Sequence, residues 1–535
     1  MKDTRFIAIL LIISAFLFFF GLGNMALTDP DETFYAQTAK EMLASGDWVT
    51  PTIFGQPQFE KPVFYYWMVM LGYLVFGVGE FAARFPSAIF GIAGVLGVYF
   101  LARKLFSSPL CGFLSGIVTA TSAIYVVLAR GCVTDMTLMV FILLCFLFFL
   151  RGWLGGGSYN YYVSSVMAAL AVLTKGPIGL LIPAAAVFFY VLYTRQWKKL
   201  WKVPIGWCIV IFLAVSAPWY VMATRAHGMA FINEFFGFQN ITRFLHPEHR
   251  IGSTPFFYVP IVIAEVFPWS IFLLFGAWDM YRDRGFSTGL RSHKAFLLIW
   301  FLVVFLFFSV SRTKLVTYIF PIFPVLAIVV GRFWERFISA APEDKDTPKR
   351  MAPAFYIFLI SSIAAAIGLC FFIGHEYPQG VTPAIILAAI FTGGILLSAM
   401  FFLRREKESS FYLIIASVIL LAVPLVIYVL PIVEEYESSK AVSLYVKEHV
   451  SLAEALGGEC DHRRGIAFYS DRTDIVDIHP YGSLHEFILR EDRVWGIVQE
   501  KHYNQIKNDG RYRISEPLFQ SGEYIVFHNK PAGAE

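Results

Sequence analysis

The sequence has 535 residues, and its composition excludes an ordinary soluble globular protein. Hydrophobic residues make up 57% of the chain and charged residues only 15%, with 55 Phe and 12 Trp. Apolar runs of roughly 18 to 22 residues recur, and each can cross a bilayer as a helix that satisfies its own backbone hydrogen bonds. The net charge of +4 is small and spread along the chain, so nothing indicates nucleic-acid binding. We therefore predict a polytopic α-helical membrane protein.

The cysteine and glycine patterns argue against a disulfide-stabilised C-terminal domain and against a nucleotide-binding site. Most of the six Cys lie in apolar runs, and the polar C-terminal region has only Cys460, so a disulfide framework is excluded there. The sequence has no CxxC pair, no P-loop and no GxGxxG motif. We expect no nucleotide cofactor.

The apolar runs begin at Phe6 to Leu22, which we interpret as an uncleaved anchor because Gly23-Asn24-Met25 offers no small-x-small cleavage site. Later connections alternate in charge. Those rich in Lys and Arg are expected in the cytoplasm by the positive-inside rule: Arg103-Lys104, Arg151, Arg195 to Lys202, Arg282 to Lys294, Arg332 to Arg350 and Arg404 to Lys407. The alternation predicts about thirteen spans with the N-terminus inside. It predicts a transmembrane domain over residues 1–433 and an extracytoplasmic domain over 434–535.

The first outer loop, residues 24–84, is predicted to hold two interfacial helices. Asp29 to Ser45 has an N-terminal cap in Asp29, Pro30 at the first helical position and a stop at Gly46, and its apolar residues lie on one face. Pro62 to Phe76 is too short to cross a membrane and carries several aromatic residues, which suits an interfacial helix.

The last hundred residues are more polar and predict a small soluble α+β domain. We expect a helix over Ser439 to Glu448. We expect strands over Gly465 to Tyr469, Arg493 to Gln499, Tyr512 to Ser515 and Tyr524 to His528.

Carboxylates gather on the outer side of the predicted topology. Asp29, Asp31 and Glu32 follow the first apolar run, Glu60 stands beside Lys61, and Asp135 begins another span. The first three also suit a well-capped helix start. Transfer of a sugar from a polyprenyl phosphate would use such an arrangement, since a carboxylate deprotonates the acceptor hydroxyl and cations stabilise the departing phosphate.

Several segments together resemble the bacterial aminoarabinose transferases, relatives of the protein O-mannosyltransferases with the GT-C membrane fold. The segments are DPDETFYAQTAKEML, GQPQFEKPVFYYW, FAARFPSAIFG, LTKGPIGLLIP, FPWS and SRTKLVTYIFPIFP. They occur in order over roughly the first 330 residues, whereas the C-terminal region is similar only in position and general character. The chain departs from the family pattern DEPRYAE, because Thr33 and Phe34 replace Pro and Arg, and Gln58 stands where an aromatic residue is usual.

The resemblance implies roles for individual residues. Asp31 matches the family's candidate catalytic carboxylate, and Asp135 is the alternative. Lys61 matches a lysine that holds the lipid phosphate, and Glu60 matches a metal or structural contact. Substrate binding is expected from Glu32, Tyr35, Lys61, Tyr65, Lys175, Arg243, Arg250, Arg312 and Lys314.

Three of these sites have an alternative explanation. The segment RFLHPEHR has two equally good interpretations. It is a loop solvated by lipid headgroups, or it is a loop in which His249 joins Glu60 around a divalent cation, Zn or Mg. Lys175 and Lys314 lie at helix ends, where snorkelling of the ammonium group to the membrane surface explains a lysine without any function.

The favoured hypothesis is a glycosyltransferase of the inner, cytoplasmic membrane that acts at its outer face. The donor is a polyprenyl-phosphate sugar such as an undecaprenyl-phosphate sugar, and the acceptor is lipid A, another glycolipid, a polysaccharide or a protein of the cell envelope. The alternative is a lipid or glycolipid transporter. Transporters tend to carry ionisable residues at mid-membrane and structural repeats, and here only Glu265 lies deep in an apolar run.

Overall fold

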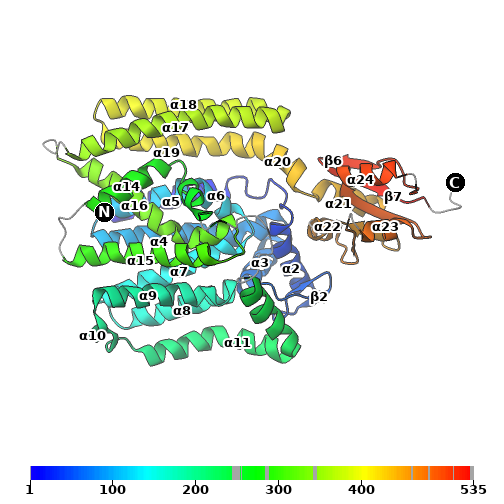
Figure 1. Cartoon of the computed structure of the whole chain (residues 1–535), viewed down its shortest axis with the longest axis horizontal. Coiled ribbons are helices and arrows are strands. Elements are labelled where there is room, and N and C mark those ends of the chain that lie inside the picture. Colours follow the sequence, from blue (N-terminus) through cyan, green and yellow to red (C-terminus); the bar gives the residue numbers. More distant parts are fainter. Residues whose placement is uncertain are drawn as a thin grey trace. The chain divides into compact units, whose positions relative to one another are not determined.

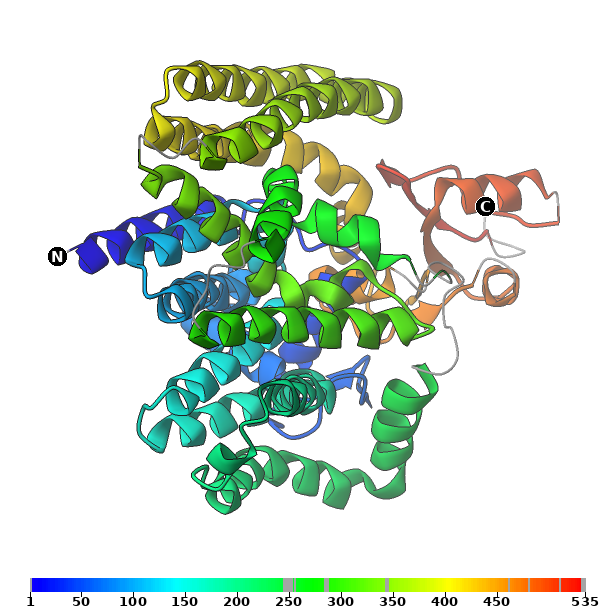
Figure 2. The same ribbon diagram turned by 60° about the vertical axis from the view of Figure 1, so that its left-hand side comes forward.

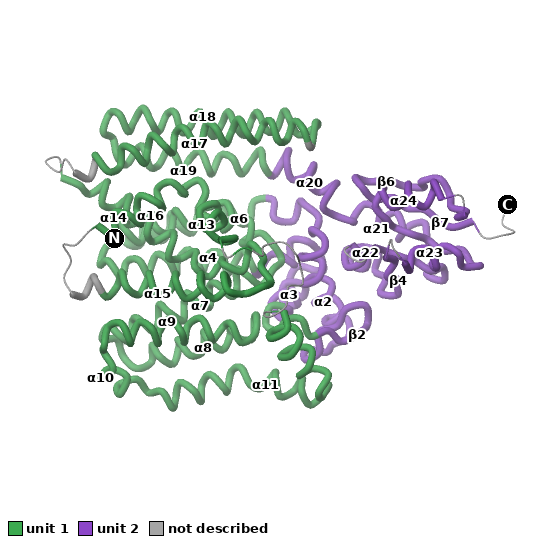
Figure 3. The backbone as a smooth tube through the Cα atoms, viewed as in Figure 1, with its two compact units in different colours: residues 1–20, 59–65, 87–425 green, residues 21–58, 66–86, 426–535 purple. Residues whose placement is uncertain are grey.

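The computed structural model describes residues 2–243, 254, 256–282, 288–341, 346–459, 462–479, 482–509 and 511–530. The chain divides into two compact units (Figure 3). Unit 1 comprises residues 1–20, 59–65 and 87–425, and unit 2 comprises residues 21–58, 66–86 and 426–535.

Unit 1 consists of helices, many of which lie side by side (Figures 1 and 2). They are α1 (Lys2–Phe19), most of α4 (Glu80–Phe106), α5 (Pro109–Thr121), α6 (Ala123–Arg130), α7 (Thr134–Trp153), α8 (Tyr159–Lys175), α9 (Ile178–Thr194), α10 (Trp197–Leu200), α11 (Ile205–Phe231), the π-helix η1 (Ile232–Thr242), α13 (Tyr258–Glu265), α14 (Ser270–Arg282), α15 (Thr288–Val310), η2 (Val316–Ile322), α16 (Phe323–Ser339), α17 (Asp346–Glu376), η3 (Pro378–Gly380), α18 (Val381–Leu403) and α19 (Lys407–Pro424).

The length and composition of these helices confirm a multi-pass membrane protein. In the described part of the chain, eight helical stretches are long and apolar enough to cross a membrane. The number rises to ten if two bent pairs each count as one span: α5 with α6, bent by 65°, and α13 with α14, bent by 104°. The predicted helical membrane fold is thus confirmed. The expected number of thirteen spans stays a prediction.

Small residues and one arginine hold the centre of unit 1 together. Gly331 of α16 lies so close to Ser115 of α5 that an added Cβ would be 2.5 Å from the Ser115 backbone nitrogen, so only glycine allows this approach. Arg130 donates hydrogen bonds to the carbonyl oxygens of Leu17 and Phe20, at 3.0 and 2.8 Å. These are carbonyls that the end of α1 leaves without a helical partner.

Unit 2 begins with the first loop of the chain. It contains α2 (Asp31–Ser45), the short strands β1 (Thr52–Ile53) and β2 (Gln56–Pro57), and most of α3 (Phe64–Phe76). Helix α2 ends at Gly46, which adopts a left-handed conformation with φ of +71°, as expected of a glycine stop. Two expectations were wrong. Asp29 does not cap the helix, because Pro30 stands at the N-cap position, and the buried residues are not confined to one face, because residues 32–39 and Met42 are all buried. The place of α2 at the membrane surface stays a prediction.

The rest of unit 2 is a five-stranded sheet covered by helices. It follows η4 (Leu425–Val429) and α20 (Leu430–Glu437). The strands are β3 (Ala455–Gly458), β4 (Val476–Asp477), β5 (Val494–Gln499), β6 (Phe519–Ser521) and β7 (Tyr524–His528), in the order β4-β3-β5-β7-β6. The helices are α21 (Lys440–His449), α22 (Arg463–Ser470), α23 (Ser483–Ile488) and α24 (Glu500–Asn508). Strand β3 runs parallel to β4 and β5, and β7 runs antiparallel to β5 and β6.

Both faces of this sheet are buried, as alternation along β5 shows. Trp495 and Ile497 pack with residues of α21 and α22, whereas Val494 and Val498 pack with residues of α23 and α24. The predicted helix at residue 439 and the strands at residues 493 and 524 are confirmed. The predicted strand from Gly465 to Tyr469 is wrong, since it forms α22, and residues 512–515 contribute only a bridge between Ile514 and Asn529.

Candidate active site

A cavity of about 500 Å³ in unit 1 brings together five of the charged residues singled out in the sequence. Glu60, Lys61, Asp135, Lys175 and Arg243 line it. The rest of the lining combines uncharged polar residues with an apolar surface: Gln239, Asn240, Ser311, Thr313 and Tyr318, and Leu138, Pro177, Ile178, Leu181, Phe236, Ile241, Phe307 and Phe308. The cavity therefore offers three cations and two carboxylates beside an apolar wall.

Asp135 and Lys175 form an ion pair in this cavity. Asp135 lies in the first turn of α7 and Lys175 is the last residue of α8, and their charged atoms are 2.6 Å apart. The ammonium group also lies 5.0 Å from the centre of the Tyr318 ring. The chain turns at Gly176, whose φ of +84° favours glycine, and α9 begins two residues later. The LTKGP motif thus places a lysine at the cavity and reverses the chain directly after it.

Lys61 lies half-buried at the entrance to α3. Burial lowers the pKa of its ammonium group to about 8, with Lys175 and Arg243 acting in the same direction and Glu60 opposing them. A cation held in this way gains more from a nearby anion than an exposed lysine does, because its charge is poorly solvated. The cavity is suited to a phosphate group.

Arg243 is positioned by the π-helix η1 and by a neighbouring loop. Its guanidinium donates to Oε1 of Gln239 at 2.5 Å, and its carbonyl oxygen accepts a hydrogen bond from Oγ1 of Thr313 at 2.6 Å. Gln239 in turn donates to Glu234 at 2.8 Å. These contacts join two segments that lie 70 positions apart in the sequence.

Other residues proposed from the sequence are elsewhere in unit 1 or outside the described residues. Lys314 is buried and donates to the carbonyl oxygen of Ser311 at 2.7 Å, and Arg312 is exposed; neither lines the cavity. The hydroxyl of Tyr65 is hydrogen-bonded to Ser87 at 2.8 Å. His249 and Arg250 lie outside the described residues.

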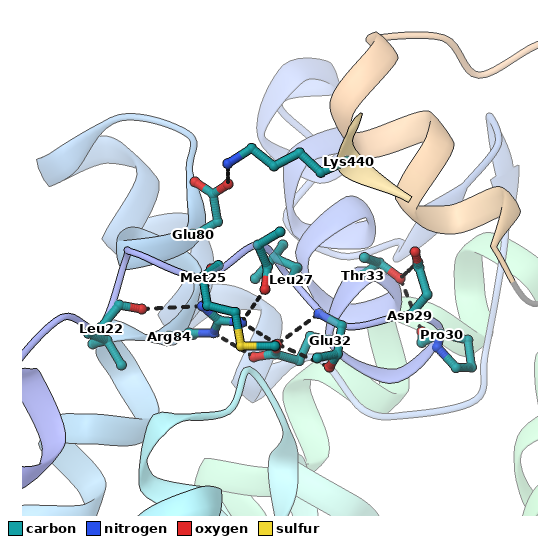
Figure 4. A network of polar contacts seen from close by, with 12 residues as sticks. Leu22, Met25, Leu27, Asp29, Pro30, Glu32, Thr33, Glu80, Arg84 and Lys440 are labelled. Atoms are coloured by element: carbon teal, nitrogen blue, oxygen red, sulfur yellow. Dashed lines mark hydrogen bonds and ion pairs between the residues drawn. The ribbon is translucent and has the colours of Figure 1, made fainter. Parts of the chain in front are cut away.

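In unit 2, Glu32 is buried in an ion pair. Arg84 donates to both carboxylate oxygens of Glu32, at 2.8 and 2.5 Å, and both side chains are at most 7% exposed (Figure 4). The same guanidinium donates to the carbonyl oxygens of Leu22, Met25 and Ala26. Glu32 also accepts hydrogen bonds from the backbone and hydroxyl of Thr28. The geometry assigns Glu32 to the stability of the loop, in contrast to the predicted contact with substrate.

Asp29 joins the first loop to the C-terminal part of unit 2. Its carboxylate accepts hydrogen bonds from the backbone nitrogen and hydroxyl of Ser439, at 3.0 and 2.6 Å, and from the Thr33 hydroxyl at 2.7 Å. Burial raises its pKa to about 6, although these hydrogen bonds oppose the shift. Asp29 therefore links two segments of unit 2 and does not cap α2.

Ion pairs reinforce this junction on both sides of Asp29. Lys40 of α2 pairs with Asp471 and donates to the carbonyl oxygen of Phe468 at 2.7 Å. Lys440 of α21 pairs with Glu80 at 2.7 Å (Figure 4). The C-terminal part of unit 2 is therefore fastened to α2 at Lys40, to the residue Asp29 just before α2, and to the first residue of α4.

Asp31 and Tyr35 lie on α2 itself. Asp31 is an exposed residue in the first turn, directly before the buried Glu32. The Tyr35 ring packs against Phe34 and Tyr66, with ring centres 5.1 and 5.9 Å apart. Tyr35 is 8% exposed, which makes it a packing residue of unit 2.

Sequence reasoning missed Gln239, Asn240 and Tyr318. The first two follow the long apolar run of α11, in FGFQNITRF, where two adjacent amides in an otherwise apolar stretch were a usable signal. Tyr318 lies in SRTKLVTYIFPIFP, but its place beside Lys175 depends on packing across 143 positions and has no local signal.

Comparisons with known proteins agree with this architecture. Residues 60–222 match the family described as dolichyl-phosphate-mannose-protein mannosyltransferase. The chain is 33% identical over 325 residues to the undecaprenyl phosphate-alpha-4-amino-4-deoxy-L-arabinose arabinosyl transferase of Edwardsiella ictaluri (strain 93-146), an alignment that covers 59% of this chain and 57% of that protein. It is 32% identical over 319 residues to an uncharacterized protein of Aquifex aeolicus (strain VF5), covering 59% and 61%. The alignments thus span about 60% of the length of these relatives.

The structure of ArnT from Cupriavidus metallidurans bound to undecaprenyl phosphate is similar over nearly the whole chain. The TM-score is 0.81 at 21% sequence identity, and the match covers 99% of this chain and 98% of that one. The fold is that of the GT-C membrane glycosyltransferases. The resemblance to the bacterial aminoarabinose transferases is thus confirmed in sequence over about 60% of the chain and in fold over nearly all of it.

Proposed function

We propose that the protein transfers a sugar from a polyprenyl-phosphate donor to an acceptor at the outer face of the inner membrane. The observation that carries the proposal is the cavity of unit 1, where Lys61, Lys175 and Arg243 line one space beside an apolar wall. Cations suit the phosphate, and the apolar wall suits the first isoprene units. The donor class agrees with the relatives, which are named undecaprenyl phosphate-dependent arabinosyl transferases. A glycolipid such as lipid A is the acceptor that the family resemblance implies.

In the proposed reaction, the acceptor oxygen attacks the anomeric carbon of the donor sugar. A glycosidic bond forms there while the bond from that carbon to the phosphate oxygen breaks, and the polyprenyl phosphate leaves with the electron pair. Lys61 and Arg243 stabilise the negative charge that develops on the leaving phosphate. Arg250, Arg312 and Lys314 remain proposed contributors.

The proposed general base is Asp31, with Asp135 as the alternative. Asp135 is engaged in an ion pair with Lys175 at 2.6 Å, so an acceptor hydroxyl would have to compete with that contact. Asp31 is exposed and begins a helix that the rest of unit 2 holds in place. We assign to the C-terminal part of unit 2 the role of ordering α2.

A divalent cation, Zn or Mg, is part of the proposal only through Glu60 and His249. Of these, the described residues include Glu60 alone, and within them no group of three His, Cys, Asp or Glu side chains could hold a metal ion. One carboxylate does not make a metal site. The mechanism above therefore uses only protein groups.

The proposed topology has thirteen crossings. The eight long stretches, the two bent pairs and the helices α1, α8 and α9 would together give this number. The N-terminus then lies in the cytoplasm, and the cavity and the C-terminal domain of residues 434–535 lie outside. The transporter alternative is not favoured, because the fold is that of glycosyltransferases.

The test uses the purified full-length protein in detergent, radiolabelled undecaprenyl-phosphate sugars and a membrane extract as the source of acceptor. Label should move from the donor to a glycolipid, and Lys61→Ala should reduce this transfer at least tenfold. The matched control is Lys202→Ala, which removes an exposed lysine from a different loop. The proposal fails if no donor is consumed, or if both variants lose transfer equally.

A further inference from the structure

A second polar groove lies in unit 1, between the last turn of α14 and the first turns of α17. Its volume is about 350 Å³, and it is lined by Phe275, Trp278, Arg282, Lys349, Arg350 and Pro353. None of the described residues that line it is acidic, and three of the six are cations. The groove is therefore positively charged, and Phe275 and Trp278 contribute aromatic surface to its lining.

One buried carboxylate organises the charge beside the groove. Asp279 is 5% exposed and accepts hydrogen bonds from Arg350 at 2.7 Å and from Arg336 at 2.9 Å. Two guanidinium groups share one carboxylate, so the surroundings keep a net positive charge. Arg282 stacks over the Trp278 ring at 4.8 Å, and Lys349 is exposed. Arg350 is thus held in place by Asp279, whereas the exposed side chains of Arg282 and Lys349 supply the other two positive charges of the groove.

An apolar surface continues from the groove along both helices. On α17, Tyr356, Ile357 and Ile360 follow Pro353 at helical spacing and are 48%, 44% and 68% exposed. On α14, Leu274 is 47% exposed and lies one turn before Trp278. In a membrane protein, such surfaces face the acyl chains of lipids. A ligand with a phosphate head and hydrocarbon tails matches both parts.

The groove is separate from the candidate active site. Lys294 of α15 donates to the carbonyl oxygen of Met280 at 2.9 Å, which holds the start of α15 beside the end of α14. From there α15 runs for 23 residues, roughly 35 Å, and Phe307 and Phe308 near its other end line the active-site cavity. The groove also joins two of the basic segments that the positive-inside rule places in the cytoplasm.

We propose that this groove binds the phosphate of an anionic phospholipid from the cytoplasmic leaflet. Arg282, Lys349 and Arg350 contact the phosphate, and the acyl chains lie along the apolar residues of α14 and α17. Basic pockets between transmembrane helices on this side of a membrane are suited to anionic headgroups. The inference goes beyond glycosyl transfer and does not depend on it.

The experiment measures lipid binding to the delipidated full-length protein by native mass spectrometry, with phosphatidylglycerol, phosphatidylcholine, undecaprenyl phosphate and inorganic phosphate as separate probes. The wild type should prefer phosphatidylglycerol to phosphatidylcholine. The variant Arg282→Gln with Lys349→Gln should bind phosphatidylglycerol about 30-fold more weakly, since each basic residue near an anionic headgroup contributes roughly fivefold.

The matched control removes the same charge from another basic segment of the same proposed side. Lys198→Gln with Lys202→Gln changes two exposed lysines that do not line the groove, and its affinity should equal that of the wild type. Equal losses in both double variants would overturn the proposal in favour of general surface charge. Stronger binding of inorganic phosphate than of phosphatidylglycerol would overturn it in favour of a free phosphate site. A loss of undecaprenyl phosphate binding in the groove variant as large as the loss of phosphatidylglycerol binding would overturn it in favour of the polyprenyl phosphate, since binding of that lipid in the active-site cavity should be the same in both proteins.

Melting temperatures distinguish a variant that has lost the lipid site from a variant that has failed to fold. Without lipid, both double variants should melt within about 2 °C of the wild type, because exposed side chains contribute little to stability. Added phosphatidylglycerol should raise the melting temperature of the wild type and the control, and not that of the groove variant. A rise of the same size in all three proteins would overturn the proposal.

Discussion

The ion pair between Glu32 and Arg84 makes a quantitative prediction about the stability of unit 2. Glu32→Gln removes the negative charge and leaves the guanidinium buried, with the carbonyl oxygens of Leu22, Met25 and Ala26 still accepting its hydrogen bonds. Removing one partner of a buried ion pair costs about 3–5 kcal/mol. Unit 2 has about 170 residues, for which each kcal/mol shifts the melting temperature by about 2–4 °C. We expect a loss on the order of 10 °C.

The assay combines a thermal scan of intrinsic fluorescence with limited proteolysis of unit 2 on the purified protein. Asp31→Asn is the matched control, since it removes one carboxylate from the preceding, exposed position and should cost at most about 1 kcal/mol. Replacing both members of the pair by Met should recover part of the loss, because no buried charge then remains.

The outcomes separate a structural role from a catalytic one. If Glu32→Gln melts like the wild type but no longer transfers sugar, the carboxylate acts on substrate and the assignment to stability is refuted. If Asp31→Asn keeps its melting temperature and loses transfer, the general base is Asp31. If Asp31→Asn transfers normally, that part of the proposed mechanism is wrong.

Three further predictions concern the cavity and the junction within unit 2. Because burial and neighbouring cations lower the pKa of Lys61 to about 8, the amine loses its charge as pH rises through that value. The donor KM should therefore rise between pH 7 and 9, Lys61→Arg should flatten this dependence, and a constant KM in the wild type would contradict it. For Asp135 and Lys175, a double-mutant cycle with Asn and Met should give a coupling energy of about 1–3 kcal/mol in melting experiments, and a value near zero would show that the ion pair is not formed. Gly465→Ala would place a Cβ 2.3 Å from Oδ1 of Asp29 and should lower the melting temperature by several degrees, whereas Gly79→Ala, which meets no atom within 4 Å, should not. Equal effects of the two alanines would rule out the close contact at Asp29.

Local sequence patterns predicted the features whose causes are local. The glycine stop at Gly46 and the short aromatic helix α3 follow from backbone conformation and from segment length, which neighbouring residues determine. The clustering of Lys61, Asp135 and Lys175 was expected because all three were assigned to one end of the predicted spans. Their meeting in one cavity agrees with that expectation.

The errors arose where a distant partner decides the outcome. Residues Gly465 to Tyr469 have β-forming side chains, but they form α22, which packs against α2 and α21, and burial there outweighs local propensity. Glu32 looks like a site residue until Arg84, 52 positions later, is placed beside it. Asp29 likewise finds Ser439 only in the folded chain.

The separation of Asp29 from Ser439 also sets an order of events during synthesis. The two residues are 410 positions apart. At about 5–20 residues per second, roughly 20–80 seconds pass between their emergence from the ribosome. During that time Asp29 and Lys40 lack the partners that later cover them, and the nascent first loop exposes surface that chaperones and proteases recognise. Premature termination between the end of α19 and Ser439 would therefore leave all the helices of unit 1 but a first loop without the partners that cover it.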